Sequence, residues 1–228
     1  SIFYYGMLNH AYRFRHDRCI VEKRSGVGVM DKFGLEIIPY IYDNIAPNSY
    51  WSPAYYRATY NNQEGVLALN GTEIIPCIYD DIDTWLTTDN FMVKSGKLKG
   101  LYTPRGKVIV PCEYTKISRW RETSLIHVKI DDQEGLYSPE GQEILPCQFI
   151  ICKELNGISL INRGGFSKNG KVQNGIWGAI NKEGKIIVPC KYNDITPYAG
   201  SERIEADGGY IKDIYDFNGN YLRSEYKW

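Results

Sequence analysis

The sequence predicts an all-β protein built from tandem antiparallel β-hairpin or meander repeats. Three observations predict this class: a glycine–glycine–proline pattern recurs along the 228 residues, glycine (22) and tyrosine (19) are abundant, and 43% of residues are apolar. Glycine, tyrosine and β-branched residues favour tight turns and strands. We expect an open, β-solenoid-like array, and a closed β-propeller with five or six blades is the alternative.

The repeat is clearest in five segments that align without gaps, at 28–45, 65–82, 100–117, 135–152 and 178–195. Each has a first glycine, a second glycine six residues later and a proline five residues after that. The prolines are Pro39, Pro76, Pro111, Pro146 and Pro189, in steps of 37, 35, 35 and 43 residues. A spacing this regular indicates one repeated structural unit.

Each column of the repeat has a physical reason. The first glycine opens a short strand, and the second, such as Gly34, lies in a turn that favours positive φ. The proline cannot donate a hydrogen bond to a ladder, so it marks an edge strand or a bulge. Apolar residues two before, three after and six after the proline predict inward-facing positions, as at Ile37, Tyr42 and Ile45. In the later units these columns hold Ile74, Tyr79 and Ile82; Ile109, Tyr114 and Ile117; Ile144, Phe149 and Cys152; Ile187, Tyr192 and Ile195.

A further strand candidate precedes each first glycine, at 19–23, 55–60, 91–94, 125–130 and 158–162. Each unit therefore has three or four short strands. We divide the chain into an N-terminal cap segment (1–18), five repeats (19–200) and a degenerate sixth repeat that serves as a C-terminal cap (201–228). In the last unit Asp213 replaces the first glycine and Ser224 the proline, and terminal repeats are often atypical in this way.

The pattern Gly-x5-Gly-x3-(Val/Leu/Ile)-Pro-Cys-x-Tyr-Asp-x-Ile resembles the WG repeat, also called the KWG or WG β-repeat, a family found chiefly in bacterial proteins. The resemblance covers about residues 19–223. The Trp-Gly pair itself occurs once, at Trp177-Gly178, and the other units have Val27, Glu64, Lys99 or Glu134 before the glycine. The resemblance implies a repetitive β fold, and it implies neither a common reaction nor a common ligand.

Four cysteines directly follow the repeat proline: Cys77, Cys112, Cys147 and Cys190. A metal site would need several of them around one ion, and equivalent positions in stacked or radially arranged units cannot all converge. We therefore expect small buried apolar residues, no metal and no cofactor. Reduced thiols favour a cytoplasmic location, with secretion after signal-peptide cleavage as the alternative.

Carboxylates cluster at Asp80–Asp83 and Asp131–Glu134. A glycosidase needs two carboxyl groups placed across a cleft, whereas neighbours in one turn are more often solvated or bonded to turn amides. We expect no catalytic residues and no enzyme activity. A propeller-type glycoside hydrolase with paired carboxylates is the enzymatic alternative.

The inter-repeat loops at 46–54, 83–90, 118–124 and 163–176 vary most in length and sequence. Binding residues concentrate on such loops, and Tyr, Trp and Arg are typical of binding hot spots. The candidate binding residues are Tyr50, Trp51, Trp85, Arg119, Trp120 and Arg121. Trp85, Trp120 and Tyr198 each follow their proline by nine residues. We therefore interpret that column as an aromatic plug between units, with an exposed binding stripe as the alternative.

The balance of charges and the lack of a long apolar run argue against nucleic acid and membrane as partners. Lys plus Arg and Asp plus Glu each number 27, so no net charge attracts nucleic acid. No apolar run approaches the roughly 18 residues of a membrane span. We predict a non-enzymatic repeat scaffold that binds another protein through its inter-repeat loops. A carbohydrate-binding module is the alternative, because Trp and Tyr faces also stack on sugar rings.

Overall fold

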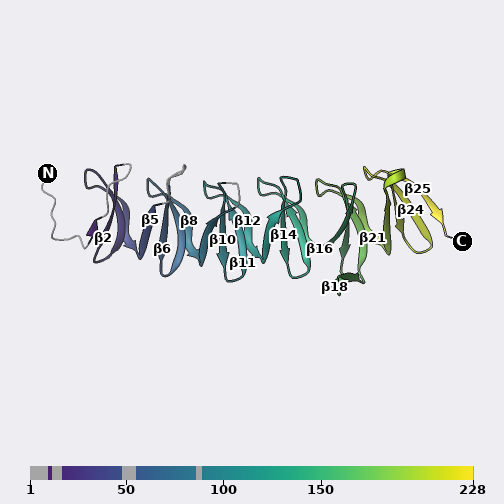
Figure 1. Cartoon of the computed structure of the whole chain (residues 1–228), viewed down its shortest axis with the longest axis horizontal. Helices are drawn as coiled ribbons and strands as arrows, with labels where there is room; N and C mark the ends of the chain where they lie inside the picture. Colours follow the sequence, from purple (N-terminus) through teal and green to yellow (C-terminus); the bar gives the residue numbers. More distant parts are fainter. Residues whose placement is uncertain (1–9, 12–16, 48–54, 86–88, 228) are drawn as a thin grey trace. The chain divides into compact units, whose positions relative to one another are not determined.

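A computed structural model describes residues 10–11, 17–47, 55–85 and 89–227, and almost all of their ordered structure is strand (Figure 1). The chain divides into two compact units, Ser1–Cys112 and Glu113–Trp228. In the described part, the helical structure is the short 3-10 helix η2 (Ala199–Ser201). None of the helical residues described forms a segment long and apolar enough to cross a membrane.

The first unit contains three four-stranded antiparallel sheets, each a meander in chain order. The first sheet consists of β1 (His10–Ala11), β2 (Arg18–Lys23), β3 (Gly26–Asp31) and β4 (Glu36–Tyr42). The second consists of β5 (Asn44–Pro47), β6 (Tyr55–Tyr60), β7 (Gln63–Ala68) and β8 (Glu73–Tyr79). The third consists of β9 (Asp81–Thr84), β10 (Phe91–Ser95), β11 (Leu98–Tyr102) and β12 (Val108–Tyr114).

The second unit contains a seven-stranded, a four-stranded and a two-stranded sheet. The seven-stranded sheet runs β13 (Lys116–Arg119), β14 (Ile126–Ile130), β15 (Gln133–Tyr137), β16 (Glu143–Leu155), β17 (Ile158–Arg163), β20 (Ile176–Ile180) and β21 (Ile186–Tyr192). The four-stranded sheet comprises β22 (Asp194–Tyr198), β23 (Arg203–Asp207), β24 (Ile211–Asp216) and β25 (Tyr221–Tyr226). The two-stranded sheet is the hairpin of β18 (Phe166–Lys168) and β19 (Lys171–Gln173).

The sheets are tandem and antiparallel, and none formed by the described strands closes into a barrel. The predicted all-β repeat class is therefore confirmed. The sheets are offset from the sequence repeats, because the sheets that begin with β5, β9, β13 and β22 take their first strand from the residues that follow a repeat proline. A single residue, Asp43, separates β4 from β5 in the first unit.

A polar residue four after the proline makes this break between strands. The amide of Asp43 donates to the Thr59 carbonyl at 2.8 Å, and its carboxylate accepts from the Asn62 amide at 3.3 Å. In the fourth repeat Ile150 holds this position and is buried. There the strand continues for 13 residues as β16, which joins two sequence repeats into the seven-stranded sheet.

The repeat proline lies in a strand whose pairing is irregular opposite the first glycine. In the second sheet the register of β7 and β8 shifts on both sides of Val66. A Cβ on Gly65 would lie 2.7 Å from the Ile75 carbonyl and 2.8 Å from the Cys77 amide, so no larger residue fits. The prediction of an edge strand or a bulge is confirmed: β4, β8, β12 and β21 are edge strands, and the pairing of β4, β8 and β21 is also irregular.

The core is formed by apolar residues shared between consecutive sheets, as where Val66 and Ile75 of the second sheet meet Ile82 and Val93 of the third. The residue directly before the proline is fully buried in every repeat: Ile38, Ile75, Val110, Leu145 and Val188. Of the isoleucines predicted two before the proline, Ile109 and Ile187 are buried, but Ile37, Ile74 and Ile144 are only half-buried. These three pack against the core clusters while remaining half-buried, so the inward-facing assignment holds for all five isoleucines.

The aromatic residue three after the proline pairs with a residue two after the next first glycine. The hydroxyl groups of Tyr79 and Tyr102 are 2.8 Å apart in the first unit. The second unit has the same arrangement at Tyr114–Tyr137 (3.0 Å) and Tyr192–Tyr215 (2.6 Å). Where Phe149 replaces the tyrosine, its counterpart is Ile180, and both belong to one apolar cluster.

Candidate binding surfaces

The predicted binding residues fall into different environments. Tyr50 and Trp51 lie outside the described residues. Trp85, in the first unit, is buried with 8% of its surface exposed. In the second unit Arg119 is the last residue of β13, and Trp120 and Arg121 follow it in the loop that joins β13 to β14.

The loop at 118–124 is held by its own hydrogen bonds. The Trp120 amide donates to the Leu125 carbonyl at 2.8 Å, and the Thr123 hydroxyl donates to the Trp120 carbonyl at 2.6 Å. The Leu125 amide donates to the Thr123 hydroxyl oxygen at 3.2 Å. Arg121 has a φ of 54°, an uncommon backbone conformation for a residue with a side chain. The loop therefore has a defined conformation without any partner.

Trp120 anchors this loop, and its two arginine neighbours face solvent. The Trp120 side chain is 7% exposed and its ring lies 5.4 Å from that of His127. The guanidinium of Arg121 lies over the Trp120 ring at 4.3 Å and forms an ion pair with Glu154 at the end of β16. Partial burial lowers the pKa of Arg121. Arg119 is exposed, so a buried indole is flanked by two arginines, of which Arg121 covers its ring.

The aromatic residues nine positions after the proline differ in how deeply they are buried. Trp85 and Trp120 are buried, which fits the interpretation of an aromatic plug, whereas Tyr198 is 40% exposed. The guanidinium of Arg203 lies 5.1 Å from the Tyr198 ring. Burial of the two tryptophans does not test whether their loops bind a partner, and that assignment stays a prediction.

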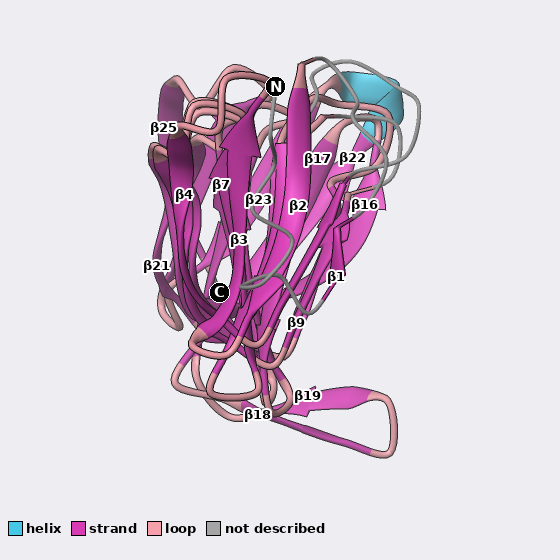
Figure 2. Ribbon diagram, turned by 90° about the vertical axis from the view of Figure 1, so that its left-hand side faces the viewer, coloured by secondary structure: helices cyan, strands magenta, loops and turns pink. Residues whose placement is uncertain are grey.

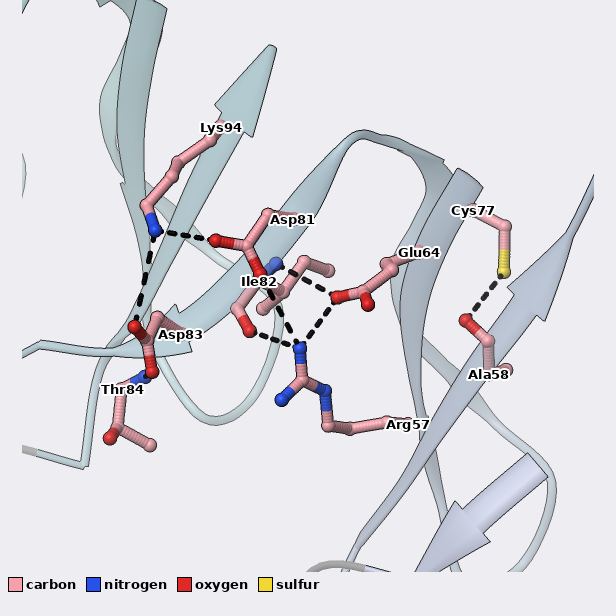
Figure 3. A network of polar contacts seen from close by, with 9 residues as sticks. All are labelled: Arg57, Ala58, Glu64, Cys77, Asp81, Ile82, Asp83, Thr84 and Lys94. Atoms are coloured by element: carbon pink, nitrogen blue, oxygen red, sulfur yellow. Dashed lines mark hydrogen bonds and ion pairs between the residues drawn. The ribbon is translucent and has the colours of Figure 1, made fainter. Parts of the chain in front are cut away.

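A polar network that the sequence did not predict lies between the second and third sheets of the first unit (Figure 3). Arg57 on β6 donates through Nη2 to the Glu64 carboxylate and to the Ile82 carbonyl, both at 2.6 Å. The Ile82 amide donates to the same Glu64 oxygen at 3.0 Å. Lys94 on β10 contacts Asp81 at 2.5 Å. The network thus satisfies main-chain groups of β9 with side chains from the preceding sheet.

The carboxylates of this network shift the pKa values of its two cations, Arg57 and Lys94. Burial acts to lower the pKa of Arg57, but the hydrogen bond to Glu64 and the charges of Glu64 and Asp81 outweigh it, so the pKa is raised. The hydrogen bond to Asp81 is the main cause that raises the pKa of Lys94. Next to the network is a pocket of about 180 Å³. It is lined by Tyr55, Arg57, Val66, Ile82, Asp83, Thr84 and Phe91.

The spacing of the Arg57–Glu64 pair recurs in alternate repeats. His127 Nε2 lies 2.6 Å from the Glu134 carboxylate, and Lys212 donates to Glu205 at 2.6 Å. Each pair spans seven residues across a β-hairpin, at positions eight and one before the first glycine of the repeat or, in the last unit, before Asp213, which replaces it. A comparison of the residues at these two positions along the repeats could have revealed the network from the sequence.

The carboxylate clusters are engaged by donors. The Gly96 amide donates to Asp80 at 2.6 Å and the Ser167 amide donates to Asp132 at 3.1 Å. Asp81 binds Lys94, and Glu134 binds His127. These partners fit the interpretation of the clusters as structural groups.

The cysteine column packs on the first glycine of each repeat. Figure 3 shows Cys77 over β6, where its Sγ lies 3.6 Å from the Ala58 carbonyl. Cys190 makes the equivalent contact with Ile161 at 3.9 Å, and both cysteines are half-buried. In the described part of the chain the cysteines form no disulfide, and no cluster of three or more potential metal ligands occurs there.

Two of the loops grouped together in the sequence, 118–124 and 163–176, lie at opposite ends of the second unit (Figure 2). The loop at 118–124 and η2 follow the first strands of their meanders, whereas the hairpin of β18 and β19 replaces a turn at the opposite end. Figure 2 shows the hairpin extending beyond the other strands of the second unit, away from η2. The second unit therefore carries two separate candidate surfaces.

Of the comparisons with known proteins, the match to one family model agrees with the repeat pattern. No curated protein is detectably similar to this chain. Solved structures with low overall similarity include the AfRom2 CNH domain (12% identity, TM-score 0.29, covering 96% of this chain and 84% of that one) and a eukaryotic initiation factor (12%, 0.30, 92% and 64%). Hsv2 of Kluyveromyces lactis is 10% identical with a TM-score of 0.26, over 95% of this chain and 63% of that one. The family described as WG containing repeat matches residues 69–94, 100–133 and 177–202. The chain therefore carries repeats of the WG family, as its glycine, proline and aromatic columns predicted.

Proposed function

We propose that this chain is a non-enzymatic repeat scaffold that binds another protein through its inter-repeat loops. The observation that carries the proposal is the loop at 118–124, which holds two exposed arginines in a fixed frame. A loop that is ordered before binding loses little conformational entropy when a partner docks.

The chemistry of this loop suits a protein partner. Arginine is enriched at binding hot spots because its planar guanidinium forms paired hydrogen bonds and stacks on aromatic rings. Arg121 already stacks on Trp120 and pairs with Glu154, so a carboxylate on the partner would meet a guanidinium held in one orientation. Arg119 extends the same surface.

The other two functions have less support. Sugar stacking needs an open ring face, and Trp85 and Trp120 are 8% and 7% exposed. A glycoside hydrolase needs a carboxylic acid with a raised pKa. Among the described carboxylates with a resolved shift (Glu205, Asp207, Asp213 and Asp216) the pKa is lowered.

The test is capture of a partner from the native host, followed by direct titration of the purified partner. We expect Arg119→Ala combined with Arg121→Ala to weaken binding by about tenfold or more. The matched control is Lys116→Ala with Lys191→Ala, two exposed cations on strands, which should change the affinity by less than about twofold.

Trp51→Ala tests the loop at 46–54 in the same assay. If both loop variants bind the partner normally while their circular dichroism is unchanged, the loop interpretation is wrong. Glycan-array binding or glycoside hydrolysis that a single aspartate substitution abolishes would contradict the proposal itself.

A further inference from the structure

The hairpin of β18 and β19 is fixed at its base by a buried asparagine. Asn162 is fully buried; its side-chain nitrogen donates to the Asn174 carbonyl and its oxygen accepts from the Gly165 amide, both at 3.0 Å. A Cβ on Gly175 would lie 2.2 Å from the Asn162 oxygen. The neck of the hairpin therefore has one conformation, although the hairpin itself projects from the unit (Figure 2).

One face of the hairpin is wholly exposed. Phe166 pairs with Gln173 and Lys168 pairs with Lys171, so these four side chains share a face. All four are exposed, and Phe166 has 48% of its surface open to solvent. The other face carries Ser167 and the half-buried Val172. An aromatic ring and two cations thus point to solvent from one short sheet.

The hairpin places two like charges, Lys168 and Lys171, close together. Lys168 and Lys171 lie directly opposite each other beside the Asn169-Gly170 turn, and like charges in such a pair destabilise a sheet. A two-stranded hairpin is marginal in water. Residues 163–176 contain Arg163, Lys168 and Lys171 but no Asp or Glu, so the segment itself supplies no compensating charge.

The outer edge of β19 is open to a further strand. The Ser167 amide donates outward to Asp132, so Ser167 and Val172 form a pair without mutual backbone hydrogen bonds. The N–H and C=O of Val172 therefore point away from β18, and no other described strand pairs with β19. Asp132 occupies the edge of β18, which leaves β19 as the edge available for strand addition.

We propose that this hairpin docks an acidic, extended segment of a partner protein. The segment adds along the edge of β19, and its carboxylates meet Lys168 and Lys171, while an apolar residue contacts Phe166. A short peptide fits this surface better than nucleic acid or an anionic membrane, because the cationic area is one small hairpin face on a chain with no net charge. The site is independent of the loop at 118–124.

The probe is a fluorescein-labelled peptide of about eight alternating Glu and Val residues, titrated onto the whole chain by fluorescence anisotropy. We expect saturable binding that weakens at high salt. Lys168→Glu should weaken it by about tenfold or more. The same substitution replaces a like-charge pair with an opposite-charge pair, so hydrogen exchange in the hairpin should stay as slow as in the original chain or become slower. This combination separates loss of binding from loss of folding.

Two control variants complete the test. Lys182→Glu with Lys185→Glu removes two exposed lysines from the turn between β20 and β21 and should change the affinity by less than about twofold. Arg119→Ala with Arg121→Ala should leave peptide binding intact. The proposal is wrong if the peptide does not bind, if Lys168→Glu binds it normally, or if the Arg119/Arg121 variant abolishes binding. Hairpin-dependent binding of a single-stranded oligonucleotide or of phosphatidylserine vesicles without peptide binding would assign the surface to those ligands and overturn the proposal.

Discussion

At the scale of single residues, the buried tyrosine three after the proline meets a second tyrosine hydroxyl, and the phenylalanine at that position meets an apolar residue. The buried hydroxyl of Tyr114 meets that of Tyr137, and the pKa of Tyr114 is raised first by burial and then by this hydrogen bond. At the equivalent place Phe149 meets Ile180. A buried hydroxyl without a partner is costly, whereas an apolar pair has nothing to satisfy.

Tyr137→Phe should therefore lower the free energy of unfolding by about 1–2 kcal/mol, because the Tyr114 hydroxyl loses its partner in a buried place. Adding Tyr114→Phe should recover part of this loss. Chemical denaturation of the variants gives both values. Tyr210→Phe, at a position that is 90% exposed, should change stability by less than about 0.5 kcal/mol. Equal stability of Tyr137→Phe and Tyr210→Phe would contradict the pairing.

Cys190 should make stability depend on alkaline pH. Burial raises the pKa of its thiol from 9.0 to about 11, although Arg163 acts to lower it. The thiol therefore stays protonated in the folded state when the unfolded state ionises. Its contribution to stability is complete below about pH 9 and is lost as the pH rises towards about 11.

The measurement is the free energy of unfolding at a series of pH values from about 8 to about 10, before most tyrosines ionise. Cys190→Ala should flatten the decline, and Cys190 should react with a thiol reagent only after unfolding. A decline as steep in Cys190→Ala as in the original chain would exclude this thiol as its source.

At the scale of strands and turns, the repeat depends on close contact between the first glycine and the strand that contains the proline. A Cβ on Gly135 would lie 2.7 Å from the Leu145 carbonyl and 2.8 Å from the Cys147 amide. These are backbone atoms, which cannot move without disturbing the pairing of β15 with β16.

Gly135→Ala should lower the free energy of unfolding by about 1–3 kcal/mol or prevent folding of the sheet. Gly200→Ala is the matched control, because nothing lies within 4 Å of its added Cβ; it should be nearly neutral. The two can be compared by thermal unfolding. A tolerated Gly135→Ala would mean that the strands can separate without cost.

The sequence predicted turns and edge strands correctly where a residue type, such as glycine or proline, favours a single backbone role. Gly106 has the positive φ expected of the turn glycine (85°), and Pro76 lies in an edge strand. It did not predict the fusion of two repeats in β16, because Ile150 reads as an ordinary strand residue. For Trp120 the sequence left two roles open, since an aromatic residue nine after the proline favours a plug between units but also suits an exposed stripe. The Arg57 network was missed because a polar residue in a strand ordinarily faces water.

At the scale of the whole molecule, stability in a repeat array is approximately a sum of local terms. Ile109 on β12 is 2% exposed, whereas Glu113 on the same strand is exposed. Ile109→Ala should lower the free energy of unfolding by about 2–4 kcal/mol, and Glu113→Ala by less than about 0.5 kcal/mol.

Hydrogen exchange shows which sheets lose stability in Ile109→Ala. We expect faster exchange in the sheet of β9–β12 and little change in β22–β25, which are distant along the chain. Uniform acceleration over the chain would show that the array unfolds as one cooperative body. Equally mild effects of Ile109→Ala and Glu113→Ala would contradict the assignment of Ile109 to the core.

The alternation of cross-hairpin pairs has a consequence for how such a chain can be lengthened. Hydrogen-bonded polar pairs occupy the second, fourth and sixth repeats, whereas Ile20–Val27, Met92–Lys99 and Leu160–Trp177 hold these positions in the first, third and fifth. The polar pairs thus recur every two sequence repeats, with a step of 70 residues from Glu64 to Glu134. Duplication of one repeat would break this alternation and duplication of two would preserve it. The module that evolution or an engineer can copy without redesign is therefore the pair of repeats.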